Sequence, residues 1–280
     1  MKNYITMSRL TRTEGLGSQM SNFAAMYAIS LKTGHRILFR DDVPGNKGLE
    51  LNQPFDGLPI DVVSDARLTG AERVAYVFEL DTSRVVDGRV FELDSNTNYD
   101  FLGFFTSYRY WYPAREAVLG VFHFKKEIVA EAAALVAGIR SGGRQIVALH
   151  VRRADYLESP YHLNLSLDYY LNACAQFAGG QTTFLVFSDD IAWCRETFRR
   201  RTDFSYATQS SMYADLCAMS LCDHNIVANS SFSVWGALLN RSQARRVVCP
   251  SRYLKDAAGA HYVNYAWFPD DWIPLDDLVI

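Results

Sequence analysis

The second half of the chain alternates short apolar runs with helical segments, and this alternation constrains the fold more than any other feature. Residues 146–151 (IVALHV) form a near-continuous apolar run, typical of a central strand buried on both faces. Further strands are expected at residues 183–187, 204–206, 225–228 and 246–249. Helices are expected between them, at residues 167–177, 193–198, 210–222 and 232–239. This spacing predicts an α/β fold with a doubly wound parallel sheet.

The chain opens with a strand–helix–strand unit. Residues 4–7 predict a short strand, and a helix is expected from Ser18 onward. The helix follows from one apolar stripe of period 3.6, formed by Met20, Phe23, Ala24, Tyr27, Ala28 and Leu31. Gly34 is expected to end this helix, and residues 36–39 to form the next strand. Residues 44–73 are rich in Gly, Pro and Asp and predict loops with short helices.

The length of 280 residues predicts about two domains, at roughly 150 residues each. The Gly-rich break at residues 141–143 (SGG) is the best boundary. We therefore expect an N-terminal Rossmann-like domain at residues 1–141 and a C-terminal Rossmann-like domain at residues 142–280.

Composition and charge exclude several classes of protein. Apolar residues make up 49% of the chain, which is too many for a disordered protein. The 28 basic and 31 acidic residues give a net charge of −3, so nucleic acid is not an expected partner. No apolar run is long enough to span a bilayer, and the start lacks the apolar core of a signal peptide. We expect a cytoplasmic location with at most peripheral contact to the inner face of the membrane.

The sequence does not predict a metal site. The five cysteines form no C-x-x-C pair and lie in apolar contexts, so we expect reduced core residues. There is no Asp-x-Asp triplet and no His-x-x-x-His pair. Neither a metal nor another cofactor is expected.

Polar side chains follow the expected strands, where ligands bind in open α/β sheets. Arg152 and Arg153 come directly after residues 146–151, followed by Asp155. Two adjacent arginines at a strand end form a concentrated anion receptor. The alternative is a surface ion pair between Arg153 and Asp155.

Two further strand ends carry candidate groups. After residues 183–187 come Ser188, Asp189 and Asp190, where one aspartate is expected to cap the next helix and the other to face a cleft. After residues 225–228 comes the run NSSFS, in which hydroxyls and backbone N–H groups open a helix. Such a helix start can bind phosphate, although an ordinary serine N-cap explains it equally well.

Asp215 and the N-terminal turn complete the candidates. Asp215 lies on an apolar helix stripe, so its carboxylate needs a partner, either the two N–H donors of a guanine edge or a buried backbone or arginine contact. The turn EGLGSQM carries Gly15 and Gly17 of a G-x-G-x-x-G pattern, but Met20 replaces the third glycine. The turn lets a ligand approach the backbone.

Five segments together resemble glycosyltransferase family 11, the bacterial-type α-1,2-fucosyltransferases. They are GLGSQM at residues 15–20, GFFTS at 103–107 with Tyr110 and Trp111, HVRRADY at 150–156, FSDD at 187–190 and CDHNIVANSSFSVWGA at 222–237. Their order and spacing match over nearly the whole chain. The sequence departs from the family at Glu14 (usually Gly), Ser18 (Asn), Ala154 (Gly) and Val234 (Trp).

The resemblance implies a GT-B-type fold, with two Rossmann-like parallel-sheet domains facing a cleft. It implies a GDP-β-L-fucose donor, held mainly by the C-terminal half, and metal-independent transfer with inversion. The expected acceptor is a galactoside hydroxyl in a glycan or lipid-linked oligosaccharide, joined in an α-1,2 linkage. The alternatives are a transferase for another GDP-sugar and a non-catalytic nucleotide- or sugar-binding protein.

The resemblance also implies residue roles. Arg152 and Arg153 would grip the diphosphate, Asp215 would read guanine, and His150 would lie beside the nucleotide. The implied donor-binding set is Gly15, Gly17, Gln19, His150, Arg152, Arg153, Ser188, Asp189, Asp215, Asn229, Ser230, Ser231, Phe232 and Ser233. The catalytic candidates are Arg152 and Arg153, whose role the resemblance implies, and Asp155 and Glu14, which an inverting transfer could use as bases. The base would be Glu14, Asp155 or the departing phosphate itself, and Glu14 is otherwise a solvated turn residue.

Overall fold

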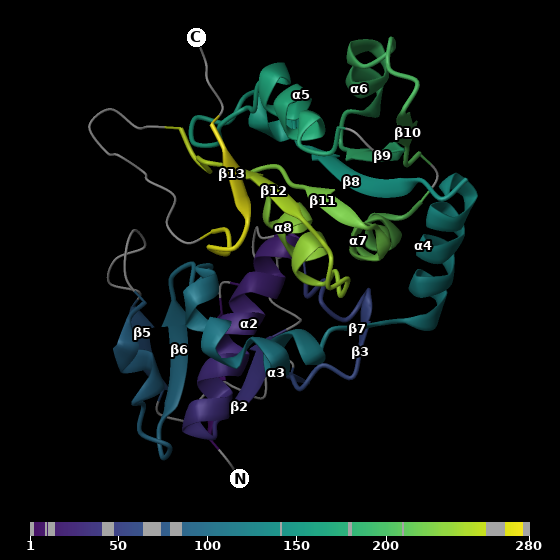
Figure 1. The fold of residues 1–280 in the computed structure, drawn as a ribbon. Helices are drawn as coiled ribbons and strands as arrows, with labels where there is room; N and C mark the ends of the chain where they lie inside the picture. The colour runs from purple at the N-terminus through teal and green to yellow at the C-terminus, as the bar shows by residue number, and fades with distance from the viewer. Residues whose placement is uncertain are drawn as a thin grey trace. The chain divides into compact units, whose positions relative to one another are not determined.

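The structure is a computed structural model, and it describes residues 3–8, 10, 15–40, 48–63, 74–78, 86–140, 142–178, 181–208, 210–255 and 267–276. By its contacts the chain separates into two compact units (Figure 1). The first comprises Met1–His123 and Tyr265–Trp267, and the second Phe124–Asn264 and Phe268–Ile280. The boundary expected at residue 141 lies inside the second unit, because helix α4 (Lys126–Ile139) packs against α7 (Met212–Leu221).

The first unit has a five-stranded, all-parallel sheet in the order β4-β2-β1-β6-β5. Its strands are β1 (Tyr4–Thr6), β2 (Arg36–Arg40), β4 (Asp61–Val63), β5 (Val74–Phe78) and β6 (Asn98–Leu102). In helix α2 (Leu16–Thr33), Met20, Phe23, Ala24 and Ala28 of the predicted apolar stripe are buried, whereas Tyr27 is half-buried and Leu31 is exposed. The helix ends at Gly34, whose φ of 77° is the left-handed conformation that glycine favours. The predicted opening strand–helix–strand unit is confirmed.

Shorter elements complete the first unit. They are β3 (Phe55–Asp56), the 3-10 helices η2 (Gly88–Phe91), η3 (Tyr108–Tyr110) and η4 (Tyr112–Ala114), and α3 (Arg115–Gly120). Strand β7 (His123–Phe124) spans the boundary between the two units. The prediction of loops and short helices over residues 44–73 is wrong at β3 and β4. Both strands are too short to show alternation, and Asp61 and Val62 of the edge strand β4 are exposed.

The second unit has a six-stranded parallel sheet in the order β10-β9-β8-β11-β12-β13. Its strands are β8 (Gln145–Val151), β9 (Thr182–Ser188), β10 (Phe204–Tyr206), β11 (His224–Ile226), β12 (Val247–Pro250) and β13 (Ile273–Leu275). Counted along the chain, this is the order 3-2-1-4-5-6 of the doubly wound nucleotide-binding fold. The five predicted strands are confirmed, and β13 was not predicted.

Helices cover both faces of this sheet. Helices α5 (Leu167–Ala175) and α6 (Ile191–Thr197) pack on the side chains of Val147, Leu149 and Val151. Helices α4 and α7, with Phe232 of α8 (Ser231–Leu238), pack on Ile146 and Ala148. Side chains therefore alternate between the two faces of the sheet along β8, and the same alternation determines the direction of the side chains that follow directly after it.

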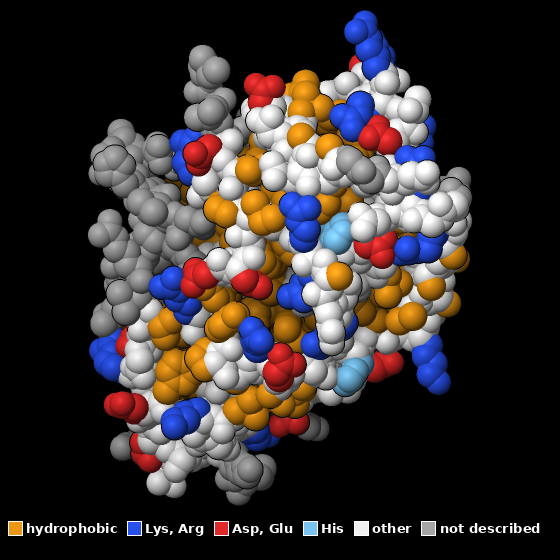
Figure 2. Space-filling view, in the orientation of Figure 1, with side chains coloured by type: hydrophobic (Ala, Val, Ile, Leu, Met, Phe, Trp, Pro, Cys, Tyr) orange, Lys and Arg blue, Asp and Glu red, His pale blue; other side chains and the backbone are white. Residues whose placement is uncertain are grey.

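The cysteines and the surface charges fit the predictions made from composition. All five cysteines are free and buried. On the face drawn in Figure 2, the described basic side chains are interspersed with acidic and apolar ones rather than gathered in one basic area. Among the helices that the structure describes, none has the length and apolarity needed to cross a bilayer.

Candidate functional site

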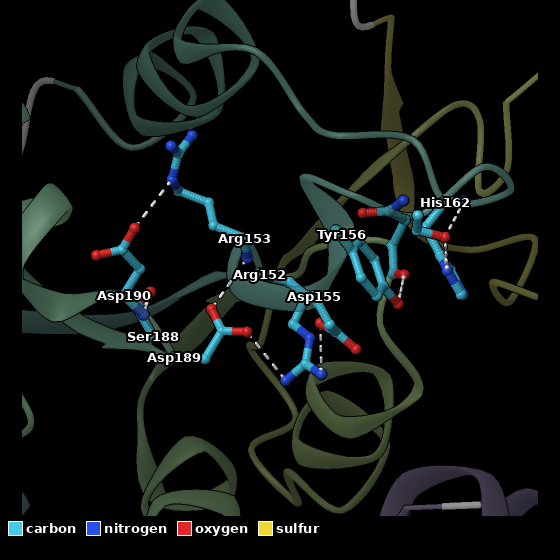
Figure 3. Close-up of polar contacts among 10 residues, drawn as sticks. Arg152, Arg153, Asp155, Tyr156, His162, Ser188, Asp189 and Asp190 are labelled. Atoms are coloured by element: carbon cyan, nitrogen blue, oxygen red, sulfur yellow. Dashed lines mark hydrogen bonds and ion pairs between the residues drawn. The ribbon is translucent and has the colours of Figure 1, made fainter. Parts of the chain in front are cut away.

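The candidate site lies at the carboxyl ends of β8, β9 and β11 in the second unit. Strands β9 and β11 flank β8, and the chain leaves β8 towards one face of the sheet and β11 towards the other. This topological switch point is where open α/β sheets bind ligands. Three segments meet there: residues 150–156, residues 188–190 and residues 228–233 (Figure 3).

The two arginines of the first segment point away from each other (Figure 3). Arg153 extends to α6, where its Nε lies 3.4 Å from Asp190 Oδ2 and its guanidinium 3.9 Å from the centre of the Trp193 ring. Arg152 extends the opposite way. The pair continues the strict alternation of β8, so the two side chains do not converge on one point.

Arg152 is held by two carboxylates. Its Nη1 lies 3.1 Å from Asp189 Oδ2, and its Nη2 lies 2.8 Å from Asp155 Oδ1. Burial alone would lower the pKa of Arg152, but the two carboxylates outweigh it and raise that pKa above its ordinary value. Asp155 reaches Arg152 rather than Arg153 because the 3-10 helix η5 (Ala154–Tyr156) brings residues three apart together.

The two aspartates after β9 have different roles. Asp190 caps α6, since its Oδ1 accepts a hydrogen bond of 3.1 Å from the Trp193 N–H. Asp189 Oδ1 accepts from the Arg153 N–H at 2.9 Å. Ser188 Oγ accepts from the Asp190 N–H at 2.9 Å. The predicted helix cap is confirmed for Asp190, while Asp189 secures the arginine segment.

Residues 229–233, called the phosphate loop below, are fixed from several sides. Asn229 is fully buried, and its Nδ2 donates to Leu163 O at 2.8 Å and Tyr253 O at 2.7 Å. Ser233 Oγ accepts from the Ala228 N–H at 3.2 Å. Asn229 and Ser233 therefore shape the loop.

The start of α8 follows this turn. The Ser230 side chain makes no capping bond to the helix. The Tyr253 hydroxyl hydrogen-bonds both the backbone and the side chain of Ser231. The helix start thus combines backbone N–H groups with the hydroxyls of Ser230 and Ser231, a combination that suits an anion.

His150 is buried beside the phosphate loop. Its ring centre lies 5.8 Å from that of Phe232. Burial, with the positive charge of Arg152, lowers the pKa of His150 to about 3. The imidazole is therefore neutral at physiological pH, and its Nδ1 has no hydrogen-bond partner among the described residues.

Asp215 lies in the first turn of α7. The Ser210 hydroxyl donates a hydrogen bond to its carboxylate. Burial raises the pKa of Asp215 to about 6, and the nearby charge of Glu131 acts in the same direction. In the part of the chain that the structure describes, no arginine lies within ion-pair distance of Asp215.

The predicted N-terminal residues lie in the first unit. Gln19 is buried and bound to backbone, with its Nε2 donating to Gly48 O at 3.1 Å and its Oε1 accepting from the Glu50 N–H at 2.8 Å. Gly15 precedes α2 with an ordinary φ of −78°, and Gly17 is buried in the first turn. Glu14 lies outside the described residues.

Sequence reasoning missed two tyrosines. Tyr156 contacts both Arg152 and the phosphate loop, as described below. Tyr156 closes the HVRRADY segment, so its place beside Arg152 was a usable signal. Tyr253 contacts Ser231 from beyond β12, and no local pattern in the sequence connects the two.

Comparison with solved structures identifies the class of fold. Fucosyltransferase NodZ from Bradyrhizobium is similar with a TM-score of 0.55 and 15% identity, over 85% of this chain and 94% of that one. FUT1 from Arabidopsis thaliana has a TM-score of 0.56 and 12% identity, over 89% of this chain and 70% of that one. At these identities the likeness concerns the fold, which is of the GT-B type found in glycosyltransferases.

Comparison of sequences narrows the class to one family. The chain belongs to glycosyl transferase family 11, whose sequence profile matches residues 81–274. An O-antigen biosynthesis glycosyltransferase, WbnK, from Escherichia coli is 25% identical over 93% of this chain and 98% of its own length. An alpha-1,2-colitosyltransferase from Escherichia coli is 26% identical over 94% and 96%.

Proposed function

We propose that the protein transfers L-fucose from GDP-β-L-fucose to a galactoside hydroxyl of a glycan, forming an α-1,2 linkage with inversion and without a metal. The observation that carries the proposal is the juxtaposition of Arg152 with the start of α8 at the switch point of the second sheet. A guanidinium and a helix N-terminus are both groups that bind diphosphates.

The relatives support this donor and linkage. Similar structures include NodZ co-crystallised with GDP and soaked with GDP-fucose. Matching sequences include a galactoside 2-alpha-L-fucosyltransferase from Mus musculus, 28% identical over 50% of this chain and 41% of its own length. We propose Asp215 as the group that reads guanine, because its carboxylate can accept two adjacent N–H donors.

The chemistry needs a cation where the leaving group departs. As the bond from the anomeric carbon to GDP breaks, positive charge develops on the sugar and negative charge on the diphosphate. Arg152 stabilises that departing charge, while the acceptor oxygen bonds to the opposite face of the anomeric carbon. The acceptor proton passes to Asp155, Glu14 or the departing phosphate. Arg153 is stacked on Trp193, paired with Asp190 and directed away from Arg152, so its role is indirect: it holds in place the segment that carries Arg152.

The second candidate is transfer of another sugar from its GDP donor. The colitosyltransferase is 26% identical over 94% of this chain, and a galactoside 2-alpha-L-fucosyltransferase from Bos taurus is 23% identical over 80%. A non-catalytic protein that binds the nucleotide is the third candidate. Titration calorimetry with GDP, UDP and NADH, followed by donor hydrolysis with GDP-fucose and other GDP-sugars, separates them. NADH binding in preference to GDP would contradict the proposal.

Arg152→Ala tests the mechanism directly. Removing one group that stabilises transition-state charge typically costs about 10²–10³ in rate. We expect a loss of that size in kcat for Arg152→Ala, and a loss in Arg153→Ala that reports on its supporting role. Arg199→Ala is the control, because Arg199 is exposed beyond the C-terminal end of α6, whereas the site contacts the N-terminal end of that helix. Turnover of Arg152→Ala at the rate of the control would contradict the assignment.

Chelation tests the proposed independence from metals. Among the described residues, no group of three or more His, Cys, Asp or Glu side chains is arranged to hold a metal ion. We expect transfer to continue at an unchanged rate after dialysis against EDTA. A loss that added Mg²⁺ or Mn²⁺ restores would show that a metal neutralises the diphosphate.

A further inference from the structure

Tyr156 lies between the two parts of the site that we assign to the diphosphate. Its hydroxyl donates a hydrogen bond of 3.0 Å to Asn229 O, at the start of the phosphate loop. The Ser230 side chain also hydrogen-bonds this hydroxyl. On its face, the ring carries the guanidinium of Arg152, 5.4 Å from the ring centre. One side chain thus contacts both the cation and the helix start.

The opposite face of the Tyr156 ring is also occupied. The His162 ring stacks on it, with centres 4.2 Å apart and planes 16° from parallel (Figure 3). Ser159 Oγ lies 2.8 Å from His162 Nδ1, and Lys255 Nζ donates to Ser159 O at 2.6 Å. The ring is buried and held between Arg152 and a hydrogen-bonded support, so it has little freedom to turn.

The Tyr156 hydroxyl remains a donor at working pH. Burial raises the pKa of Tyr156 to about 12, with the charge of Arg152 opposing the rise. The phenol is therefore neutral, and its proton stays available to the Asn229 carbonyl. A preorganised anion site loses less on binding than one whose groups must first be brought together.

We propose that Tyr156 is a positioning residue for the donor diphosphate, holding the Arg152 guanidinium and the phosphate loop in one fixed arrangement. The proposal rests on the function proposed above, because it takes the diphosphate of a GDP-sugar as the ligand. It predicts that loss of the hydroxyl alone weakens donor binding, although Tyr156 itself need not touch the donor.

Tyr156→Phe removes the hydroxyl and keeps the ring under Arg152 and against His162. We expect the Kd for GDP, measured by calorimetry, and the KM for GDP-fucose each to rise about tenfold. We expect kcat to change less than twofold, because Arg152 still reaches the leaving group once the donor is bound. Tyr156→Ala, which also removes the platform under Arg152, is expected to lower kcat as well.

Tyr169→Phe is the matched control. Tyr169 is also buried, and its hydroxyl donates to Val227 O at 2.6 Å, just before the same loop but away from Arg152. We expect this variant to lose thermal stability while keeping the wild-type Kd for GDP. If Tyr156 had only a structural role, both variants would lower the melting temperature and leave the Kd unchanged.

Hydrogen exchange of the ligand-free protein separates this inference from the proposed function. We expect faster amide exchange over residues 229–233 in Tyr156→Phe than in the wild type. If the wild type binds GDP and Tyr156→Phe has the same Kd and the same amide exchange, the inference about Tyr156 is overturned while the proposed function stands. Wild-type protein that does not bind GDP would overturn the proposed function and the diphosphate role of Tyr156 with it, while exchange would still report whether Tyr156 holds the loop.

Discussion

At the scale of single residues, each arginine of the site forms an ion pair with at least one carboxylate. The Asp189 side chain is only 20% exposed and also accepts from the Arg153 N–H, so its contact with Arg152 is more firmly fixed than that of Asp155. The Asp155 side chain is 63% exposed, and an ion pair so exposed contributes only about 0–1 kcal/mol. An arriving diphosphate can displace Asp155 at little cost. That release would free Asp155 to act on an acceptor proton.

We predict that GDP binding depends on pH through Asp215, the group proposed to read guanine. A guanine edge donates two hydrogen bonds, so only the ionised carboxylate accepts both. Because the pKa of Asp215 is raised to about 6, its carboxylate becomes protonated as the pH falls through 6. We expect the Kd for GDP to rise severalfold between pH 7.5 and pH 5, as measured by calorimetry at constant ionic strength.

Asp215→Asn is the control for this dependence. We expect a weaker affinity for GDP that stays nearly constant between pH 7.5 and pH 5. Inosine diphosphate, which lacks the 2-amino group of guanine, should bind the wild type more weakly than GDP and bind Asp215→Asn with little distinction. Equal binding of the two nucleotides by the wild type would exclude Asp215 as the group that reads guanine.

At the scale of elements, the hydrophobic periodicity of the sequence predicted the elements whose burial gives rise to that periodicity. The central strands β8 and β9 were predictable because they are buried on both faces and nearly continuously apolar. Strand β13 is only three residues long, so it has no long apolar run that would have predicted it. The opposite directions of Arg152 and Arg153 were also predictable, since the two residues extend the alternation of side chains along β8. Their adjacency in the motif instead suggested that both would bind one anion.

The hydrogen bonds that Asn229 and Ser233 make to the backbone were not predictable from periodicity. Their polar groups satisfy backbone carbonyls and amides from Leu163, Tyr253 and Ala228, and such partners depend on the tertiary fold. A helix start that binds phosphate and one that only needs a cap present the same residues in sequence. The two cases differ in which hydrogen-bond donors are left to bind a ligand once the hydrogen bonds within the folded loop are formed.

Helices α7 and α8 approach each other at a glycine. A Cβ built on Gly236 of α8 would lie 2.7 Å from Met219 Cβ and 2.9 Å from its Sδ on α7. We expect Gly236→Ala to destabilise the fold by about 1–3 kcal/mol, because either the helices or Met219 must move. Thermal unfolding followed by circular dichroism measures the effect.

Gly138→Ala is the comparison for this substitution. Gly138 lies in α4, and a Cβ there would meet nothing within 4 Å. Replacing this helical glycine should stabilise the fold by about 0.5–1 kcal/mol through the lower entropy of the unfolded chain. A melting temperature that rises for both variants would show that α7 and α8 can separate freely at Gly236.

At the scale of the whole molecule, the net charge of −3 conceals the groups that matter. The charges at the switch point are a local cluster of two arginines and three aspartates, and every one of these arginines has a carboxylate partner. The two-unit organisation was predictable from length alone. Its boundary was not, because the position of α4 depends on packing against α7 rather than on the Gly-rich break that follows it.

Buried histidines give the chain an acid-sensitive stability. Burial lowers the pKa of His150 from 6.5 to about 3, and burial also lowers the pKa of His162 and of His224. Between pH 6.5 and pH 3 the unfolded chain therefore binds a proton at His150 that the folded chain does not. Stability from His150 is complete above pH 6.5 and is lost as the pH falls below it. The raised pKa of Asp215 acts in the opposite direction below pH 6.

His150→Asn isolates the contribution of one histidine from these opposing terms. At about 1.4 kcal/mol per pH unit below 6.5, His150 should cost the wild type about 2 kcal/mol of unfolding free energy between pH 7.5 and pH 5. The variant lacks this term, so the difference in stability between wild type and variant should shift by about that amount in favour of the variant. Denaturant unfolding at both pH values measures this shift, and any constant cost of the substitution cancels. A difference that does not change with pH would mean that His150 is protonated in the folded protein, and hence that solvent or an acidic group reaches its ring.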